Sequence, residues 1–202
     1  MTFKQKKLKL LKKLVVIAKS VCYNYSVIRT LEKFTKESSL MKNYSADKIK
    51  NIAFLGHGNS GKSTLASSVL YHSKAIERIG NTSEGTSVFD FDAEEKKRGC
   101  SVYTAVYALE KGDTKLNLID APGLFDFAGG VSEALAAADS VIVTISGKSG
   151  LTVGAKQAVE RARNAGKATA FFVGKLNSTH AHFYRVISAL VANYGAVICP
   201  VV

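Results

Sequence analysis

The sequence predicts an α/β fold of three layers, in which helices cover both faces of a mainly parallel sheet. From Ile49 onward, apolar runs alternate with segments of helical periodicity. The runs are continuous rather than alternating, as in strands that are covered on both faces. The chain has 202 residues, 47% of them hydrophobic, and only two prolines, which is enough for one full-sized core.

The expected strands are the apolar runs at 52–55, 116–119, 141–145, 170–173 and 196–202. A further run at 101–109 is rich in β-branched and aromatic residues, and we expect it near an edge of the sheet. Helices are expected to begin near Lys62, Val131, Val153 and His180. In the last of them, apolar residues recur with the spacing of one helical face, and Gly195 can end the helix.

The net charge of +12 is unevenly distributed. Residues 1–40 hold ten Lys or Arg against two Glu, so the other 162 residues carry only +4. We therefore expect a basic arm over 1–47, helical or disordered, followed by a folded domain over 48–202. A helix in the arm would align Leu10, Leu14, Ile17 and Val21. Such a helix could contact RNA or an anionic membrane, and a solvated tail is the alternative.

The cysteines indicate a reducing environment. Cys22, Cys100 and Cys199 are far apart and lack metal-ligand spacing, so the sequence predicts neither a disulfide framework nor a zinc site. The most apolar stretch of the arm, 14–18, lies between two lysines and is too short to span a membrane. We therefore expect a cytoplasmic protein.

A phosphate-binding loop follows the first of the strands at 52–55. Its pattern is GxxxxGK[ST], and its residues are Gly56, His57, Gly58, Asn59, Ser60, Gly61, Lys62 and Ser63, with Thr64 next in the following helix. The glycines let the backbone wrap an anion at the positive end of that helix. Lys62 is then expected to neutralise the β- and γ-phosphates of a nucleotide, and Ser63 to bind Mg²⁺.

A second motif, Asp120-Ala121-Pro122-Gly123, comes directly after the strand at 116–119. Ligands of open α/β sheets lie beyond the carboxyl ends of the strands, so this motif is expected to face the same site. Asp120 would hold Mg²⁺, and the N–H of Gly123 would reach the γ-phosphate.

Residues 50–202 resemble the beginning of the GTP-binding domain of elongation factor G and its relatives, including the ribosomal-protection branch. Besides the two motifs, the resemblance rests on the stretches 92–101, 125–127 and 183–186. It implies a P-loop NTPase fold, binding of GTP or GDP with Mg²⁺, and a nucleotide-dependent switch that acts on the ribosome. Ser101 takes the place of a threonine that binds Mg²⁺ and senses the γ-phosphate. Lys62, Ser101 and Gly123 are thus the residues expected to support GTP hydrolysis.

Three departures from the family pattern alter these expectations. Leu124 stands where the family has a histidine that positions the attacking water, so hydrolysis is expected to be slow. The base-reading motif Asn-Lys-x-Asp is represented by Gly174, Lys175, Leu176 and Asn177, so guanine selectivity should weaken in favour of xanthine. The family's last guanine-binding loop is not reached by residue 202, so we expect the amino-terminal fragment of a longer factor.

Several functions remain open from the sequence. The leading hypothesis is a translational GTPase segment of the elongation or the ribosomal-protection type. The alternatives are a non-catalytic nucleotide-binding module, a truncated product without independent function, and a P-loop ATPase.

Overall fold

The computed structural model describes residues 14–18 and 43–201. The described strands are β1 Leu14–Ala18, β2 Ile49–Gly56, β3 Ala105–Lys111, β4 Thr114–Asp120, β5 Ser140–Ser146, β6 Ala168–Gly174 and β7 Ile198–Val201. The described helices are α3 Lys62–His72, α4 Ala93–Arg98, α5 Ala128–Ala137, α6 Val153–Asn164 and α7 Phe183–Tyr194. Short 3-10 turns lie at Ala46–Lys48, Thr82–Glu84 and Phe125–Phe127.

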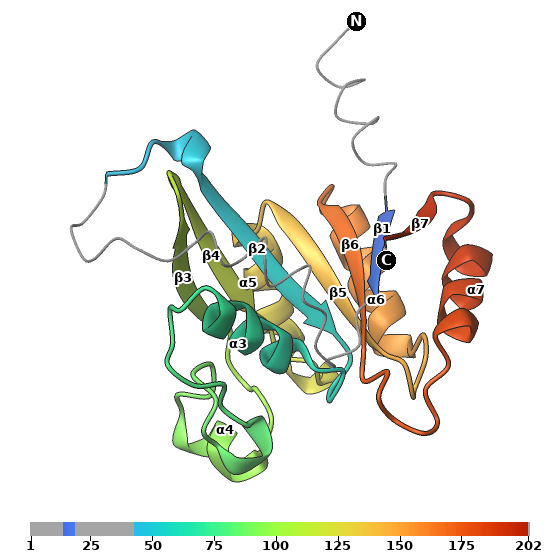
Figure 1. Cartoon of the computed structure of the whole chain (residues 1–202), viewed down its shortest axis with the longest axis horizontal. Helices are drawn as coiled ribbons and strands as arrows, with labels where there is room; N and C mark the ends of the chain where they lie inside the picture. Colours follow the sequence, from blue (N-terminus) through green and yellow to red (C-terminus); the bar gives the residue numbers. More distant parts are fainter. Residues whose placement is uncertain (1–13, 19–42, 202) are drawn as a thin grey trace, which may run out of the picture.

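The described strands form one sheet in the order β3-β4-β2-β5-β6-β1-β7 (Figure 1). All neighbours are parallel except β3, which pairs antiparallel with β4. The edge position expected for the run at 101–109 is therefore confirmed, although the strand begins only at Ala105. The predicted α/β class with a mainly parallel sheet is confirmed as well.

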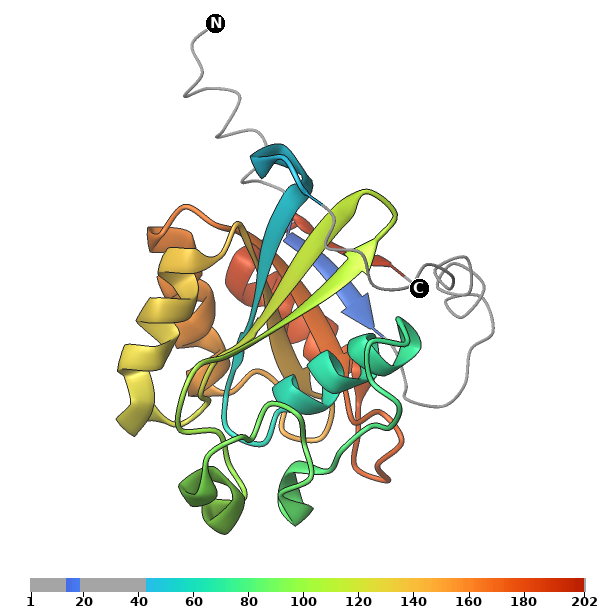
Figure 2. The same cartoon turned by 90° about the vertical axis from the view of Figure 1, so that its left-hand side faces the viewer.

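Helices lie on both faces of the sheet, as Figures 1 and 2 show, with α3 on one side and α5 and α6 on the other. β2 shows why both faces are apolar. Phe54 packs into a cluster with Leu70 of α3, whereas its neighbours Ala53 and Leu55 pack into a cluster with buried residues of α5, α6 and α7. Because successive side chains of a strand point to opposite faces, a continuous apolar run supplies both cores.

The prediction for the arm is wrong where the structure describes it. Leu14–Ala18 is a strand, not a helix, and it lies between β6 and β7, parallel to both. The run Leu-Val-Val-Ile-Ala is rich in β-branched residues, which favour strands, and two neighbouring strands satisfy its backbone. The arm therefore contributes to the sheet of the domain. The remaining arm residues up to 42 lie outside the described part of the chain.

Within the described residues, the helices are too short or too polar to cross a membrane.

Candidate functional site

The loop after β2 adopts a backbone that only glycine accommodates easily. Gly56 has φ of +143°, and a Cβ there would lie 2.6 Å from the carbonyl oxygen of Thr144 on β5. Gly61, with φ of +98°, precedes the first residue of α3. Between them the chain turns sharply into the amino end of α3, where free backbone N–H groups and the helix dipole favour an anion. The predicted strand, loop and helix arrangement is confirmed.

Lys62 reaches back across this loop. Its side chain is buried, and its Nζ donates to the carbonyl oxygen of His57 at 3.1 Å. Burial lowers the pKa of Lys62, and the neighbouring Asp120 carboxylate opposes that shift. Gly123 lies directly against the ammonium, because a Cβ on Gly123 would overlap Lys62 Nζ. The structure thus places the Lys62 ammonium beside the backbone of both phosphate-facing motifs.

Three predicted metal-binding side chains converge next to Lys62. The Ser63 hydroxyl donates to Asp120 Oδ2 at 2.5 Å, and its oxygen lies 3.3 Å from Ser101 Oγ. The other carboxylate oxygen of Asp120 is buried and has no partner among the described residues. Burial raises the pKa of Asp120 to about 6, although Lys62 and the Ser63 hydroxyl act in the opposite direction. A buried carboxylate with one oxygen free of hydrogen bonds, next to two hydroxyl groups, offers a suitable set of oxygen ligands for a small hard cation.

This oxygen set is incomplete as a metal cage. Among the described residues, no three His, Cys, Asp or Glu side chains come together as metal ligands. Mg²⁺ is commonly bound through one or two carboxylates, with substrate phosphates and waters completing its shell. Ser63, Ser101 and Asp120 fit that second arrangement, since the buried Lys62 ammonium beside them could neutralise a phosphate.

Asp90 is a nearby residue that the sequence analysis missed. It is buried before α4 and accepts a hydrogen bond from Ser101 Oγ at 3.5 Å, while its Oδ2 has no partner among the described residues. Burial and the nearby Glu95 raise its pKa, opposed by the Ser101 hydrogen bond and Lys96. In the sequence, Asp90 is one of several acidic residues between 90 and 95, and only its place before the family-like stretch could have singled it out.

The loop at 174–177, which follows β6, contacts the phosphate-binding loop through Lys175. Lys175 Nζ donates to the carbonyl oxygen of Asn59 at 2.7 Å, and Lys175 has a left-handed backbone with φ of +55°. The Gly174 carbonyl accepts a hydrogen bond from Gly147 N–H at the end of β5. Asn177 is exposed, and its side chain forms no hydrogen bond with the described residues. The loop therefore lies where a base attached to the phosphates could reach it.

Leu124 covers part of the phosphate-binding loop. A Cβ on Gly58 would lie 3.0 Å from Leu124 Cδ2, so the leucine occupies the space above this glycine. The side chain is 38% exposed and lines a small pocket with Pro122, Phe125 and Arg161. His57 packs against Phe125, with ring centroids 5.8 Å apart, and does not replace the missing histidine at position 124.

Comparison with known proteins shows which family this chain is similar to. The family model described as the elongation factor Tu GTP binding domain matches residues 47–198. The chain belongs to this family. The match covers the phosphate-binding loop, the Asp120 motif and the 174–177 loop, so the resemblance to elongation factor G-type GTPases is confirmed.

Curated relatives include tetracycline resistance protein TetM of Enterococcus faecalis, which is 37% identical over 130 residues, 64% of this chain and 20% of TetM. The mitochondrial ribosome-releasing factor 2 of Candida dubliniensis is 28% identical over 170 residues, 84% of this chain and 21% of the factor. The chain thus spans about one fifth of the length of these relatives.

Solved structures agree on the fold. A crystal structure of a protein from Thermus thermophilus has a TM-score of 0.70 and 35% identity, and it covers 73% of this chain and 22% of that protein. The bacterial selenocysteine-specific elongation factor EF-Sec has a TM-score of 0.57 and 21% identity, covering 76% of this chain and 25% of that factor. At that identity, the second likeness shows the fold alone.

Proposed function

We propose that this chain is the nucleotide-binding part of a translational GTPase, which binds GTP and GDP with Mg²⁺ and alternates between two states. The observation that carries the proposal is the convergence of Ser63, Ser101 and Asp120 beside the Lys62 ammonium. Ser63, Ser101 and Asp120 would hold Mg²⁺. When bound, the ion would neutralise phosphate charge and draw Ser101 toward the nucleotide.

The phosphates and the base of the nucleotide would be bound by different segments of the chain. Gly56–Gly61 and Thr64 would supply backbone donors to the phosphates, and Lys62 would neutralise them. The Gly123 N–H would contact the γ-phosphate, which is the part that distinguishes GTP from GDP. Lys175 would lie along the base, with Gly174 and Asn177 beside it.

The ribosome is the proposed partner, because the relatives include a ribosome-releasing factor and this family serves translation elongation. Elongation and ribosomal protection are both compatible with a domain that spans one fifth of such factors. The expected cytoplasmic location and the expected RNA or membrane contact of the basic arm stay predictions.

Direct binding tests the proposal. Affinities for GTP, XTP and ATP should be measured by calorimetry with Mg²⁺ and again with EDTA, using wild type and Ser63→Ala. We expect tight, Mg²⁺-dependent triphosphate binding that Ser63→Ala weakens. A wild-type protein without affinity for any nucleotide would contradict the proposal, and equal affinity for ATP would contradict the guanine assignment.

A second candidate is a nucleotide-dependent switch with little hydrolysis, favoured by Leu124 seated on Gly58. A leucine side chain can neither orient nor deprotonate water. Single-turnover hydrolysis with and without ribosomes separates the candidates: a rate that ribosomes raise strongly supports the GTPase, whereas bound but uncleaved GTP supports the slow switch.

A further inference from the structure

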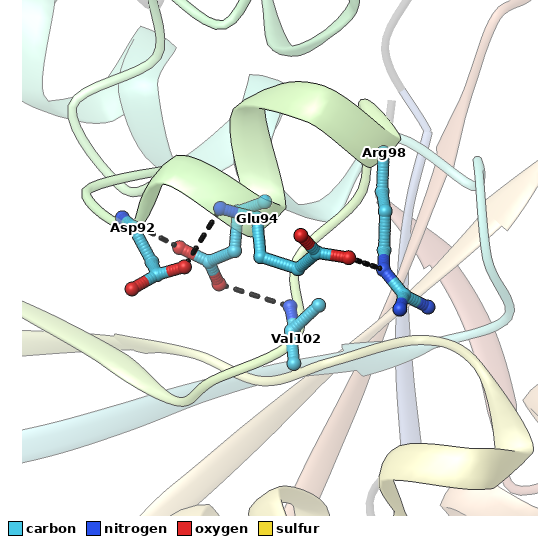
Figure 3. A network of polar contacts seen from close by, with 5 residues as sticks. Asp92, Glu94, Arg98 and Val102 are labelled. Atoms are coloured by element: carbon cyan, nitrogen blue, oxygen red, sulfur yellow. Dashed lines mark hydrogen bonds and ion pairs between the residues drawn. The ribbon is translucent and has the colours of Figure 1, made fainter.

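Glu95 is a fully buried carboxylate in the six-residue helix α4, with 0% of its surface exposed. Among the described residues it forms no ion pair, since its hydrogen-bond partners are backbone N–H groups. Its Oε2 accepts from Asp92 N–H at 3.3 Å, which closes a capping box at the start of α4. Its Oε1 accepts from Val102 N–H at 2.9 Å (Figure 3). The same oxygen also accepts from Tyr103 N–H at 3.0 Å.

The backbone carbonyl of Glu95 binds the two residues that precede Ser101 in the sequence. The Glu95 carbonyl oxygen accepts from Gly99 N–H at 2.8 Å and from Cys100 N–H at 3.3 Å. One residue therefore binds the two amides before Ser101 through its carbonyl and the two after it through its carboxylate. The N–H of Ser101 itself has no acceptor among the described residues, so this arrangement leaves it available.

The Ser101 hydroxyl faces the candidate metal site while its neighbours are held in this way. It lies 3.3 Å from Ser63 Oγ and 3.5 Å from Asp90 Oδ1. Residues 99–104 belong to no helix or strand, so no regular backbone ladder fixes Ser101. A hydrogen bond between a buried carboxylate and an amide is stronger than a neutral one and restrains the chain more firmly.

We propose that Glu95 is the positioning residue that presents the Ser101 hydroxyl and N–H to Mg²⁺ and the terminal phosphate. This inference rests on the proposed function and adds the coupling element between α4 and triphosphate sensing. Loss of the Glu95 carboxylate releases residues 102 and 103, so Ser101 is no longer held over the site. Only the triphosphate has a γ-phosphate for Ser101 to sense, so binding of the diphosphate is spared.

The test compares Glu95→Gln with the matched control Glu94→Gln in the full chain. Glutamine keeps the size of Glu95 but replaces one carboxylate oxygen by an NH₂ group. Both oxygens of Glu95 accept from backbone N–H groups, so in either orientation of the amide this NH₂ group faces another donor. Glu94 is the adjacent exposed residue and pairs with Arg98 at 2.6 Å, and its side chain forms no hydrogen bond or ion pair with residues 99–103. Affinities for GTPγS and GDP are measured with saturating Mg²⁺, together with thermal unfolding.

We expect Glu95→Gln to weaken GTPγS binding about tenfold to a hundredfold, as loss of a charged hydrogen bond implies, with little change for GDP. Glu94→Gln should change neither affinity appreciably, because exposed ion pairs contribute little. Equal weakening of both nucleotides, or no weakening, would overturn the inference about Glu95. If the wild type binds neither GTPγS nor GDP, the proposed function fails, and the positioning role fails with it.

A measurement on the wild type decides the matter if Glu95→Gln does not fold. Hydrogen exchange of the Val102 and Tyr103 amides should be slower with Mg²⁺ and GTPγS than with GDP, because their acceptor is fixed when Ser101 is engaged. Equally fast exchange in both complexes would overturn the proposal.

Discussion

Asp120 allows the most quantitative prediction, because its environment changes its protonation. It is 1% exposed at the end of β4, and burial raises its pKa from 3.8 to about 6. The folded protein therefore holds this proton more tightly than the unfolded chain. The stability that protonation provides is fully present below pH 3.8 and is lost as the pH rises through 6. At about 1.4 kcal/mol per pH unit, the difference amounts to about 3 kcal/mol at pH 7.

The assay is urea unfolding of metal-free, nucleotide-free protein between pH 4.5 and 7.5, comparing wild type with Asp120→Asn. Asparagine carries no charge and can still accept the Ser63 hydrogen bond. We expect the variant to gain about 2 kcal/mol of stability over the wild type between pH 4.5 and pH 7, because about 1 kcal/mol of the total difference has already developed at pH 4.5. Asp126→Asn, an exposed carboxylate in the following turn, is the control and should run parallel to the wild type. Parallel curves for Asp120→Asn would refute the argument.

Three further substitutions test the phosphate end, the base end and turnover. Gly123→Ala places a Cβ 2.8 Å from Gly58 N and against the Lys62 ammonium, so GTPγS affinity measured by calorimetry should fall by about tenfold or more; unchanged affinity would contradict the described packing. Asn177→Asp supplies a second acceptor for guanine and should raise the GTP-over-XTP preference roughly tenfold to a hundredfold, whereas an unaltered ratio would mean that another group reads the base. Leu124→His should speed single-turnover GTP hydrolysis by about two orders of magnitude, and an unchanged rate would remove the leucine as the cause of slow turnover.

Much of this site could be predicted because its parts follow local rules. A glycine-rich loop between a strand and a helix and an Asp at the end of a neighbouring parallel strand must meet at the carboxyl edge of the sheet. Lys62 and Asp120 accordingly lie near enough to shift each other's pKa. The meeting of Lys175 with Asn59 follows from the same rule.

The parts that sequence reasoning missed depend on contacts between distant segments. The spacing from Leu10 to Val21 suits a helix, but pairing of 14–18 with β6 and β7 overrides it, and no local pattern encodes that pairing. Glu94 and Glu95 are adjacent and chemically alike, yet one is exposed and the other is fully buried. A helix of six residues is too short for periodicity to tell them apart.

Two of the differences from the family pattern, at Leu124 and Asn177, lie in a different environment from the retained site residues, whereas Gly174 is buried at the end of β6. Lys62, Ser63 and Asp120 are all less than 10% exposed, and Asp120 interacts with Ser63 through a hydrogen bond and with Lys62 through its charge. Leu124 and Asn177 are exposed at the rim. Loss of Lys62 or Ser63 would leave the buried Asp120 carboxylate without a partner and cost stability, whereas an exposed rim residue can change at little cost. We therefore expect phosphate binding to be coupled to folding in this domain, and changes at Leu124 and Asn177 to alter turnover and base choice without loss of the fold.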